Sequence, residues 1–236
     1  MDHRNLVRRE VADLKQVWRT HPIFMVNELR LSGVSTSHET AVLATMGLSF
    51  PVSRYDLDTQ ALKDRLEQID PIAEAHVTLL ADGVLEVVVR ERKPVALYRQ
   101  GDTLTTIDID GHRIQSAISR RDHENLPLLT GEGAREAVSE AIFLSRIAEP
   151  LKDRIRGFVR VGARRWDVVL DRDQAIKLPE ENPSQGLTEV LQIISGTDLM
   201  ERDVVALDVR LPDRPTIKLK NASALYLLAA RNGDPE

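Results

Sequence analysis

The chain has 236 residues, of which 42% are hydrophobic, 29% charged and only 4% aromatic, so its cores should consist mainly of Leu, Val, Ile and Ala. This length suits one large domain or two small ones. A formal net charge of −5 argues against nucleic-acid binding, which usually needs a basic excess. The absence of cysteine excludes disulfide bonds, thiolate zinc sites and a cysteine nucleophile.

The residues at the two ends of the printed sequence predict neither a membrane-spanning segment nor a secretion signal. Residues 1–22 contain basic residues that no apolar core follows, so they predict a polar helical leader rather than a signal peptide. The longest apolar run, Ala224–Ala230, has seven residues. A bilayer needs roughly 20, so no transmembrane segment is expected within the printed sequence.

The first part of the chain predicts the order strand, helix, helix, strand, strand. Alternation of apolar and polar residues predicts the strands, and Ser/Thr followed three residues later by an acid predicts the helix starts. Gly33 ends the first strand, and Gly47 and Pro71 end the two helices. The elements are a strand over 24–31, helices opened by the capping boxes Thr36–Glu39 and Ser53–Asp56, and a hairpin of strands 75–80 and 85–90.

Four charged residues, Arg90-Glu91-Arg92-Lys93, and then Pro94 stand between two strand-like runs with no obvious loop. We interpret them as a junction at which the last strand of one module runs almost directly into the first strand of the next. A phosphate-binding cluster of Arg90, Arg92 and Lys93 is the alternative, and Glu91 in its middle argues against it.

After Pro94 the pattern becomes mostly β, and the whole chain is predicted to be an α+β protein. Asp108-Ile109-Asp110-Gly111 predicts a hairpin turn, and a calcium loop is disfavoured because the glycine comes too early. Trp166 is interpreted as a core anchor whose indole N–H finds a partner. The predicted strands are 104–107, 113–115, 126–131, 159–161, 166–170, 176–178, 205–211 and 216–220, and the predicted helices are 137–151 and 184–196.

Several motifs in fixed order resemble one known family. The first part carries Phe24-x-Val26-x-x-Leu29-x-Leu31-x-Gly33 and Glu91-Arg92-x-Pro94-Val95-Ala96, and the second carries Arg164-Arg165-Trp166-Asp167 and Leu207-Asp208-x-Arg210-Leu211. The βααββ order resembles a POTRA domain, and the complete set resembles the bacterial FtsQ/DivIB family. The resemblance covers almost all of residues 24–220.

The resemblance implies a domain organisation and a location. We expect a polar leader or juxtamembrane stalk (1–22), a POTRA domain (23–93), a mixed α/β domain with an extended, largely antiparallel sheet (94–221) and a C-terminal tail (222–236). The family has one transmembrane helix before the POTRA domain, so a membrane-spanning segment is expected upstream of Met1. The region printed here would then lie in the periplasm, on a bitopic inner-membrane protein at the division septum.

The resemblance also implies a function. Members of this family are non-enzymatic divisome scaffolds that link early and late division proteins and bind FtsB and FtsL to control septal peptidoglycan synthesis. The alternative is an outer-membrane translocation or assembly component, which would need further POTRA repeats. An enzyme is disfavoured because the six histidines show no metal-ligand spacing and no nucleophile or phosphate-loop motif occurs, so no metal and no cofactor are expected.

The last predicted strand, Thr216-Ile217-Lys218-Leu219-Lys220, is the main candidate site. Ile217 and Leu219 are expected to face the core, and the other three residues to face away from it. Lysines on a sheet edge normally block unwanted pairing. The family resemblance favours the alternative that a strand of FtsB adds to this edge, with acidic residues meeting the lysines and with Arg210 and Arg214 assisting. Proline at position 218 is the indicated test.

A second candidate surface lies on the POTRA domain and would serve recruitment by an upstream division protein. It consists of exposed polar positions on the second helix and the following strand. A solvated face without any partner would look the same in sequence. The four residues are Arg65, Glu67, His76 and Thr78.

Overall fold

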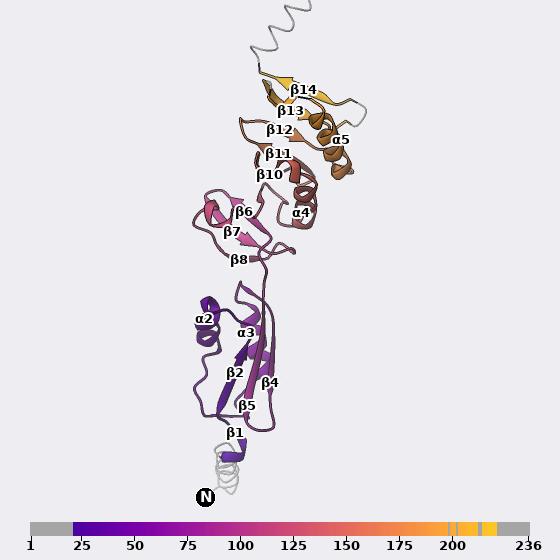
Figure 1. The fold of residues 1–236 in the computed structure, drawn as a ribbon. Coiled ribbons are helices and arrows are strands. Elements are labelled where there is room, and N and C mark those ends of the chain that lie inside the picture. The colour runs from indigo at the N-terminus through magenta and orange to yellow at the C-terminus, as the bar shows by residue number, and fades with distance from the viewer. Residues whose placement is uncertain (1–20, 198, 202, 212–213, 221–236) are drawn as a thin grey trace, which may run out of the picture. The chain divides into compact units, whose positions relative to one another are not determined.

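The computed structural model describes residues 21–197, 199–201, 203–211 and 214–220. The chain divides into two compact units between Arg92 and Lys93. Most of the predicted leader and the whole predicted C-terminal tail, including the apolar run 224–230, lie outside the described residues. Figure 1 labels the elements along the chain.

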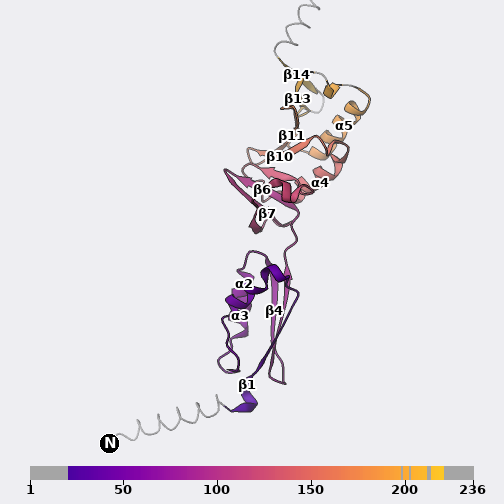
Figure 2. The ribbon, with the colours of Figure 1, turned by 60° about the vertical axis from the view of Figure 1, so that its left-hand side comes forward.

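The first unit has a three-stranded sheet in the order β2-β5-β4. Strand β2 (Glu28–Ser32) runs parallel to β5 (Val84–Glu91), which pairs in antiparallel fashion with β4 (Ile72–Leu79). Helices α2 (Thr36–Met46) and α3 (Thr59–Glu67) cover one face of this sheet (Figure 2). A short turn, η1 (Pro22–Phe24), leads into a separate ribbon of β1 (Met25–Val26) and β3 (Val52–Ser53).

The core of this unit follows directly from the two periodicities of its sequence. Alternate residues of β4 and β5 point toward the helices, while residues three or four apart on each helix point back. Full burial of one such aliphatic side chain stabilises the fold by about 1.5–3 kcal/mol. The buried residues are Val26, Val42, Met46, Leu62, Leu66, Ile72, Ala75, Leu85, Val87 and Val89.

Three local predictions for this unit are wrong, and each fails because another contact holds the backbone. The strand predicted over 24–31 is broken at Asn27, whose N–H donates to the carbonyl of Gly83 at 3.1 Å. The residue preceding α2 is Ser35, and its hydroxyl donates to Glu91 instead of capping the helix. Ser53 belongs to β3, so α3 is capped by Asp58, whose Oδ1 accepts from the Ala61 N–H at 3.0 Å.

The second unit is built on a nine-stranded sheet in the order β14-β13-β12-β11-β10-β9-β6-β7-β8. Five of its pairings are antiparallel and three are parallel, which confirms an α+β fold with a largely antiparallel sheet. The strands are β6 (Ala96–Gln100), β7 (Thr103–Ile107), β8 (Arg113–Ser116), β9 (Leu128–Thr130), β10 (Ile155–Val161), β11 (Arg165–Leu170), β12 (Ala175–Lys177), β13 (Val204–Asp208) and β14 (Thr216–Leu219).

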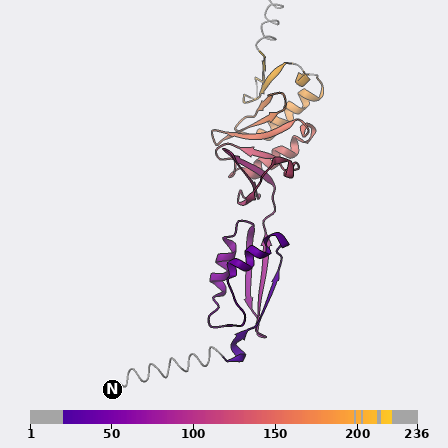
Figure 3. The same cartoon turned by 90° about the vertical axis from the view of Figure 1, so that its left-hand side faces the viewer.

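Helices α4 (Val138–Ile147) and α5 (Pro183–Ser195) lie on the same side of this sheet (Figure 3). The helix predicted over 137–151 ends at Ile147, with Ala148 as its C-cap, because Pro150 belongs to a separate turn, η3 (Glu149–Leu151). Two further turns are η2 (Arg120–His123) and η4 (Leu199–Glu201). The largest fully buried side chains of the unit include Trp166, Phe158, Leu144, Ile176 and Leu178. Across the described ranges of both units, no helix combines the length and apolar character needed to cross a bilayer.

Candidate functional site

Strand β14 forms one edge of the nine-stranded sheet, as the sequence predicted (Figure 1). Its only neighbour in the sheet is β13, to which it pairs in antiparallel fashion with Leu207 opposite Ile217 and Asp208 opposite Thr216. The other side of β14 has no strand among the described residues. Within the described ranges, one row of backbone donors and acceptors on that side therefore has no strand partner.

The register identifies which backbone groups of β14 are unpaired. The N–H of Lys220, just after the strand, donates to the carbonyl of Asp203 at 2.9 Å, so it points toward β13. Successive residues of an extended strand direct their backbone groups to opposite sides. The backbone N–H and C=O groups of Lys218 therefore also point toward β13. The backbone groups of Ile217 and Leu219 point the other way, out from the edge of the sheet.

The side chains of β14 only partly follow the prediction. Leu219 packs against the core, whereas Ile217, on the same face of β14, is 49% exposed, so Ile217 lies on the expected face without being buried in the core. The alternation of side chains correctly places both on the side of the sheet that carries the helices. Burial also depends on whether a helix reaches the outermost strand, and alternation does not contain that information.

The cations near this edge differ in how far they are neutralised. Arg210 is held by Asp208 through Nε at 2.8 Å and Nη2 at 2.6 Å, and these hydrogen bonds keep the pKa of the Asp208 carboxyl below its usual value. Lys220 lies 4.0 Å from a carboxylate oxygen of Asp203. Within the described part of the chain, no ion pair involves Lys218 or Arg214. Among the described residues near this edge, Lys218 and Arg214 are therefore the cations without an acidic partner.

A hollow of about 380 Å³ lies beside the start of β14. Leu211, whose side chain is 65% exposed, gives it an apolar part, and charged groups surround this residue. An exposed leucine between cations fits a partner segment that has both apolar and acidic side chains. The lining residues are Asp208, Arg210, Leu211, Arg214 and Thr216.

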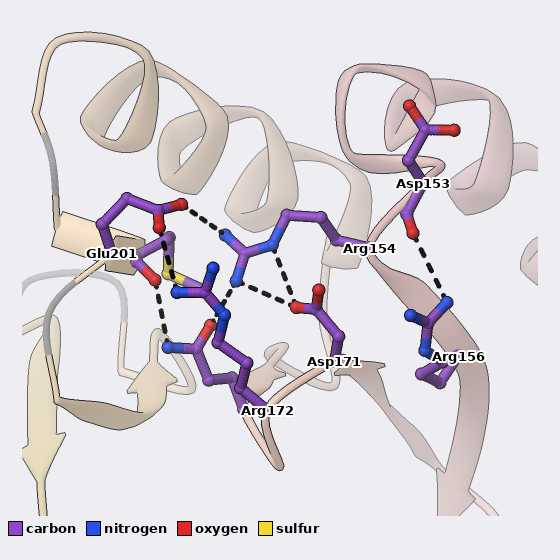
Figure 4. A network of polar contacts seen from close by, with 8 residues as sticks. Asp153, Arg154, Arg156, Asp171, Arg172 and Glu201 are labelled. Atoms are coloured by element: carbon purple, nitrogen blue, oxygen red, sulfur yellow. Dashed lines mark hydrogen bonds and ion pairs between the residues drawn. The ribbon is translucent and has the colours of Figure 1, made fainter.

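A polar network holds the connection that leads into β13 and β14 (Figure 4). Arg154, only 20% exposed, donates to Asp171 through Nε at 3.0 Å and to Gln174 through Nη2 at 2.7 Å. Gln174 is buried and donates in turn to the carbonyl of Met200, in η4, at 3.1 Å. Glu201 lies 3.8 Å from Arg154 and 2.9 Å from Arg172. The network thus ties β10 and the β11–β12 turn to η4, the segment that leads into β13.

In the first unit, the charged run 90–93 overlaps the end of β5 and fixes the end of that strand. Glu91 Oε1 accepts three hydrogen bonds, from the Ser35 N–H at 2.8 Å, the Ser35 hydroxyl at 2.8 Å and His38 Nδ1 at 2.9 Å. Arg92 Nε donates to the carbonyl of Asp70 at 3.1 Å, and Arg90 pairs with Glu74 at 3.0 Å. These residues tie β5 to the start of α2 and to the connection between α3 and β4, which disfavours a phosphate site.

Replacing Glu91 by glutamine should lower the free energy of unfolding of the first unit by about 1 kcal/mol at pH 7. Burial alone would raise the pKa of the Glu91 carboxyl, but the hydrogen bonds from Ser35 and His38 outweigh it and bring the pKa below the usual 4.5. A carboxyl whose pKa is lowered in the folded state contributes stability that is fully present above its unfolded-state pKa and is lost as the pH falls through the lowered folded-state pKa. Urea denaturation should show the difference at pH 7, and the difference should shrink and disappear as the pH falls from 4.5 through the lowered pKa of Glu91. A difference unchanged at low pH would contradict the assignment.

Comparison with known proteins decides the family. The family model described as "Cell division protein FtsQ/DivIB, C-terminal" matches residues 96–210. Similar proteins include the cell division protein FtsQ of Roseobacter litoralis, 39% identical over 93% of this chain and 75% of that protein, and that of Cereibacter sphaeroides, 38% identical over 92% and 71%. The FtsQ of Dinoroseobacter shibae is 39% identical over 94% and 74%.

The chain belongs to the FtsQ/DivIB family. Membership supports a role in the cell-division machinery, in a family of scaffold type. The matched region ends at Arg210, shortly before β14 begins. The edge strand β14 therefore lies outside the residues that the family model matches.

The four residues predicted as one recruitment surface of this FtsQ/DivIB protein lie on two different layers. His76 and Thr78 are exposed on the face of the three-stranded sheet that the helices leave open. Arg65 and Glu67 lie on α3, on the helical side, and both make intramolecular contacts. Arg65 Nη2 donates to the carbonyl of Met46 at 3.3 Å, and Glu67 Oε1 accepts from the Ala75 N–H at 3.1 Å.

The turn at Asp108 is a hairpin turn held by its own backbone. Asp108 Oδ1 accepts from the N–H of His112 at 2.7 Å and from that of Asp110 at 3.1 Å. Among the described residues, these three side chains form the one group of acids and histidines close enough to share a metal ion. The backbone N–H groups of the turn thus account for the position of the Asp108 carboxylate.

Sequence reasoning missed the residues that support the edge. Arg154, Gln174 and Glu201 come from three separate parts of the chain, and none belongs to a motif. Only Gln174 gave a sign of such a role, because it is a polar residue next to a predicted strand. An ordinary turn residue is equally expected at that position, so the sign was weak. Its burial became evident only in the structure.

Proposed function

We propose that this chain is a non-enzymatic scaffold of the bacterial divisome and that FtsB binds it by adding a strand to β14. The outward-facing backbone groups of Ile217 and Leu219 at an unpaired sheet edge carry this proposal. Strand addition uses such groups for affinity and the neighbouring side chains for selectivity. Family membership supplies the cellular context, and FtsL would join the assembly through FtsB.

The faces of β14 specify the kind of strand that fits. On the helical side the added strand meets the half-exposed Ile217, which favours an apolar residue there. On the opposite side it meets Lys218, and Arg214 lies at the adjoining hollow, which favours acidic residues. A partner segment with alternating apolar and acidic side chains satisfies both faces.

The proposed location is the septum, with this region in the periplasm and an anchor in the inner membrane. There the protein would link early and late division proteins and control septal peptidoglycan synthesis. Recruitment would use the open face of the three-stranded sheet, where His76 and Thr78 are exposed. Arg65 and Glu67 lie on α3, on the other side of the sheet from this face, and hydrogen-bond to Met46 and Ala75.

Replacing Ile217 by proline should weaken binding of the periplasmic segment of FtsB at least about tenfold, because it removes an outward N–H that the added strand needs. Proline is tolerated on an edge strand where the N–H faces solvent, so the unbound chain should stay folded. Ile217→Val keeps the N–H and should bind within about threefold of wild type. Ile217→Pro is a better test than the Lys218→Pro variant that the sequence indicated. The N–H of Lys218 faces β13, so its loss would disturb the fold.

The measurement is binding to FtsB of the same organism by calorimetry, with circular dichroism to check folding. A folded Ile217→Pro variant with wild-type affinity would show that FtsB does not add to this edge. A His76→Glu/Thr78→Arg variant is the matched control on the first unit. It should keep its affinity for FtsB and lose recruitment to midcell.

A further inference from the structure

Apolar and aromatic side chains gather at the end of the first unit where η1 leads into β1 (Figure 1). The ring of Phe24 lies 6.1 Å from that of His21 and 5.3 Å from that of Tyr55, measured between centroids. Ile23 is 71% exposed and Tyr55 is 58% exposed, so much of this apolar surface faces solvent. We call these four residues, His21, Ile23, Phe24 and Tyr55, the aromatic tip.

The backbone holds the aromatic tip in place. The Phe24 N–H donates to the carbonyl of His21 at 2.9 Å, and the carbonyl of Phe24 accepts from the Arg54 N–H at 2.9 Å. Strand β1 pairs with β3, and this ribbon is fixed to the unit by the buried Val26 and Ser53. The exposure of the tip therefore belongs to the folded unit and does not result from fraying at a chain end.

The size of the aromatic tip favours a lipid surface over a protein surface. A stable protein interface buries about 800 Å² on each partner, far more than two exposed side chains and one half-buried ring provide. A lipid–water interface needs no matching surface, because aromatic and aliphatic groups are stabilised there one by one. Tyrosine suits this environment, since its ring is apolar and its hydroxyl can stay hydrated.

The charges near the aromatic tip also fit a membrane surface. Residues 1–20, which lead into the tip, contain five basic and three acidic residues, although the whole chain has a net charge of −5. Arg54, next to Tyr55, is exposed. Anionic headgroups attract such basic residues. The exposed Asp56 and Asp82 oppose this attraction, so we expect the apolar side chains to provide most of the affinity.

We propose that the aromatic tip contacts the lipid–water interface of the inner membrane and seats the first unit on it. The inference rests on the proposed location, in which an anchor in that membrane precedes this region. Ile23 and Tyr55 enter the headgroup layer, and the ring of Phe24 supports them from behind.

This contact sets the orientation of the first unit. The carbonyl of Gly83, just before β5, accepts from the Asn27 N–H at 3.1 Å, so β5 begins at the tip end of the unit (Figure 2). The strand ends at Glu91, so the chain leaves the unit about 25 Å from the membrane contact. Seating therefore fixes the height of the open sheet face above the bilayer.

The test uses the 236-residue chain, tethered through an N-terminal six-histidine tag to vesicles that contain a nickel-chelating lipid. Because the chain has no cysteine, Arg54→Cys provides a single site beside the tip for the fluorophore NBD. His76→Cys provides the matched site, exposed on the open sheet face. On tethering, emission from position 54 should shift to shorter wavelength and be quenched by spin-labelled lipid. Emission from position 76 should not change.

Ile23→Ser/Tyr55→Ser, combined with the label at position 54, tests whether the tip causes the shift. Both side chains are exposed, so this variant should stay folded, lose the shift and the quenching, and keep wild-type affinity for FtsB. The inference is overturned if position 54 does not respond to tethering, if position 76 responds equally, or if the serine variant responds like wild type. A shift that soluble FtsB causes without vesicles would assign the tip to a protein partner and overturn it as well.

The assay also separates this inference from the proposed function. The tag supplies the tether, so the response of the tip does not depend on the natural anchor. Absence of a lipid contact together with normal FtsB binding would reject the aromatic tip as a membrane contact and leave the scaffold proposal intact. Loss of the shift in the serine variant supports the tip whatever Ile217→Pro does to FtsB binding.

Discussion

Replacing Trp166 by alanine should lower the free energy of unfolding of the second unit by about 3–5 kcal/mol, a large part of a typical domain's stability. Trp166 lies on β11, is fully buried and is one of the largest core side chains. Its removal leaves a cavity that the strands and helices around it can fill only partly. Urea denaturation followed by far-ultraviolet circular dichroism measures the change.

The same side chain also joins three elements through polar contacts. Its indole Nε1 donates to Glu140 of α4 at 2.8 Å, and Arg160 of β10 lies over its ring at 5.0 Å and pairs with Glu140. Trp166→Phe keeps an aromatic ring and loses the donor, so it should cost less than the alanine variant, about 1–2 kcal/mol. A loss below about 2 kcal/mol for Trp166→Ala would show that Trp166 does not anchor this core.

Local patterns in the sequence predicted most of the elements because each pattern depends on neighbouring residues. The alternation in β4 and β5 gave both strands, and Gly47 ends α2 with φ 59°, as its position after the helix indicated. Gly33 ends β2 for a reason that involves distant residues. With φ 80°, a Cβ at that position would lie 1.9 Å from the carbonyl oxygen of Val89, so only glycine fits.

The local predictions that are wrong in the first unit share a physical cause: in each, a residue far away in the sequence contacts the segment and changes its structure. Ser35 has the right chemistry to cap α2, but Glu91, 56 residues away, accepts its hydroxyl instead. Single-sequence patterns contain no information on such a pair. Strand β14 shows what local patterns can and cannot predict. The alternation of residues predicted which side chains share a face of the strand. The direction of the backbone groups depends on the register with β13, which the sequence does not contain.

The support of that edge is the second place where a large effect is expected. Arg154→Leu should cost about 2–3 kcal/mol, since it leaves the buried Gln174 and the carboxylate of Asp171 without a donor. The loss should be local, because Gln174 holds η4 through the carbonyl of Met200 and η4 leads into β13. Arg172→Ala is the matched control, because its pair with Glu201 is exposed and should contribute less than about 1 kcal/mol.

Hydrogen exchange distinguishes a local effect from a general one. In Arg154→Leu, amides of β13 and β14 should exchange faster than in wild type, while those of β6 and β7, at the other end of the sheet, should change little. FtsB affinity should fall together with the protection of β14, since a strand can add only to an ordered edge. If exchange rises equally across the sheet, the network stabilises the whole unit and does not specifically position β14. If β14 loses protection and FtsB binding is unchanged, the network holds the edge as inferred and FtsB binds elsewhere.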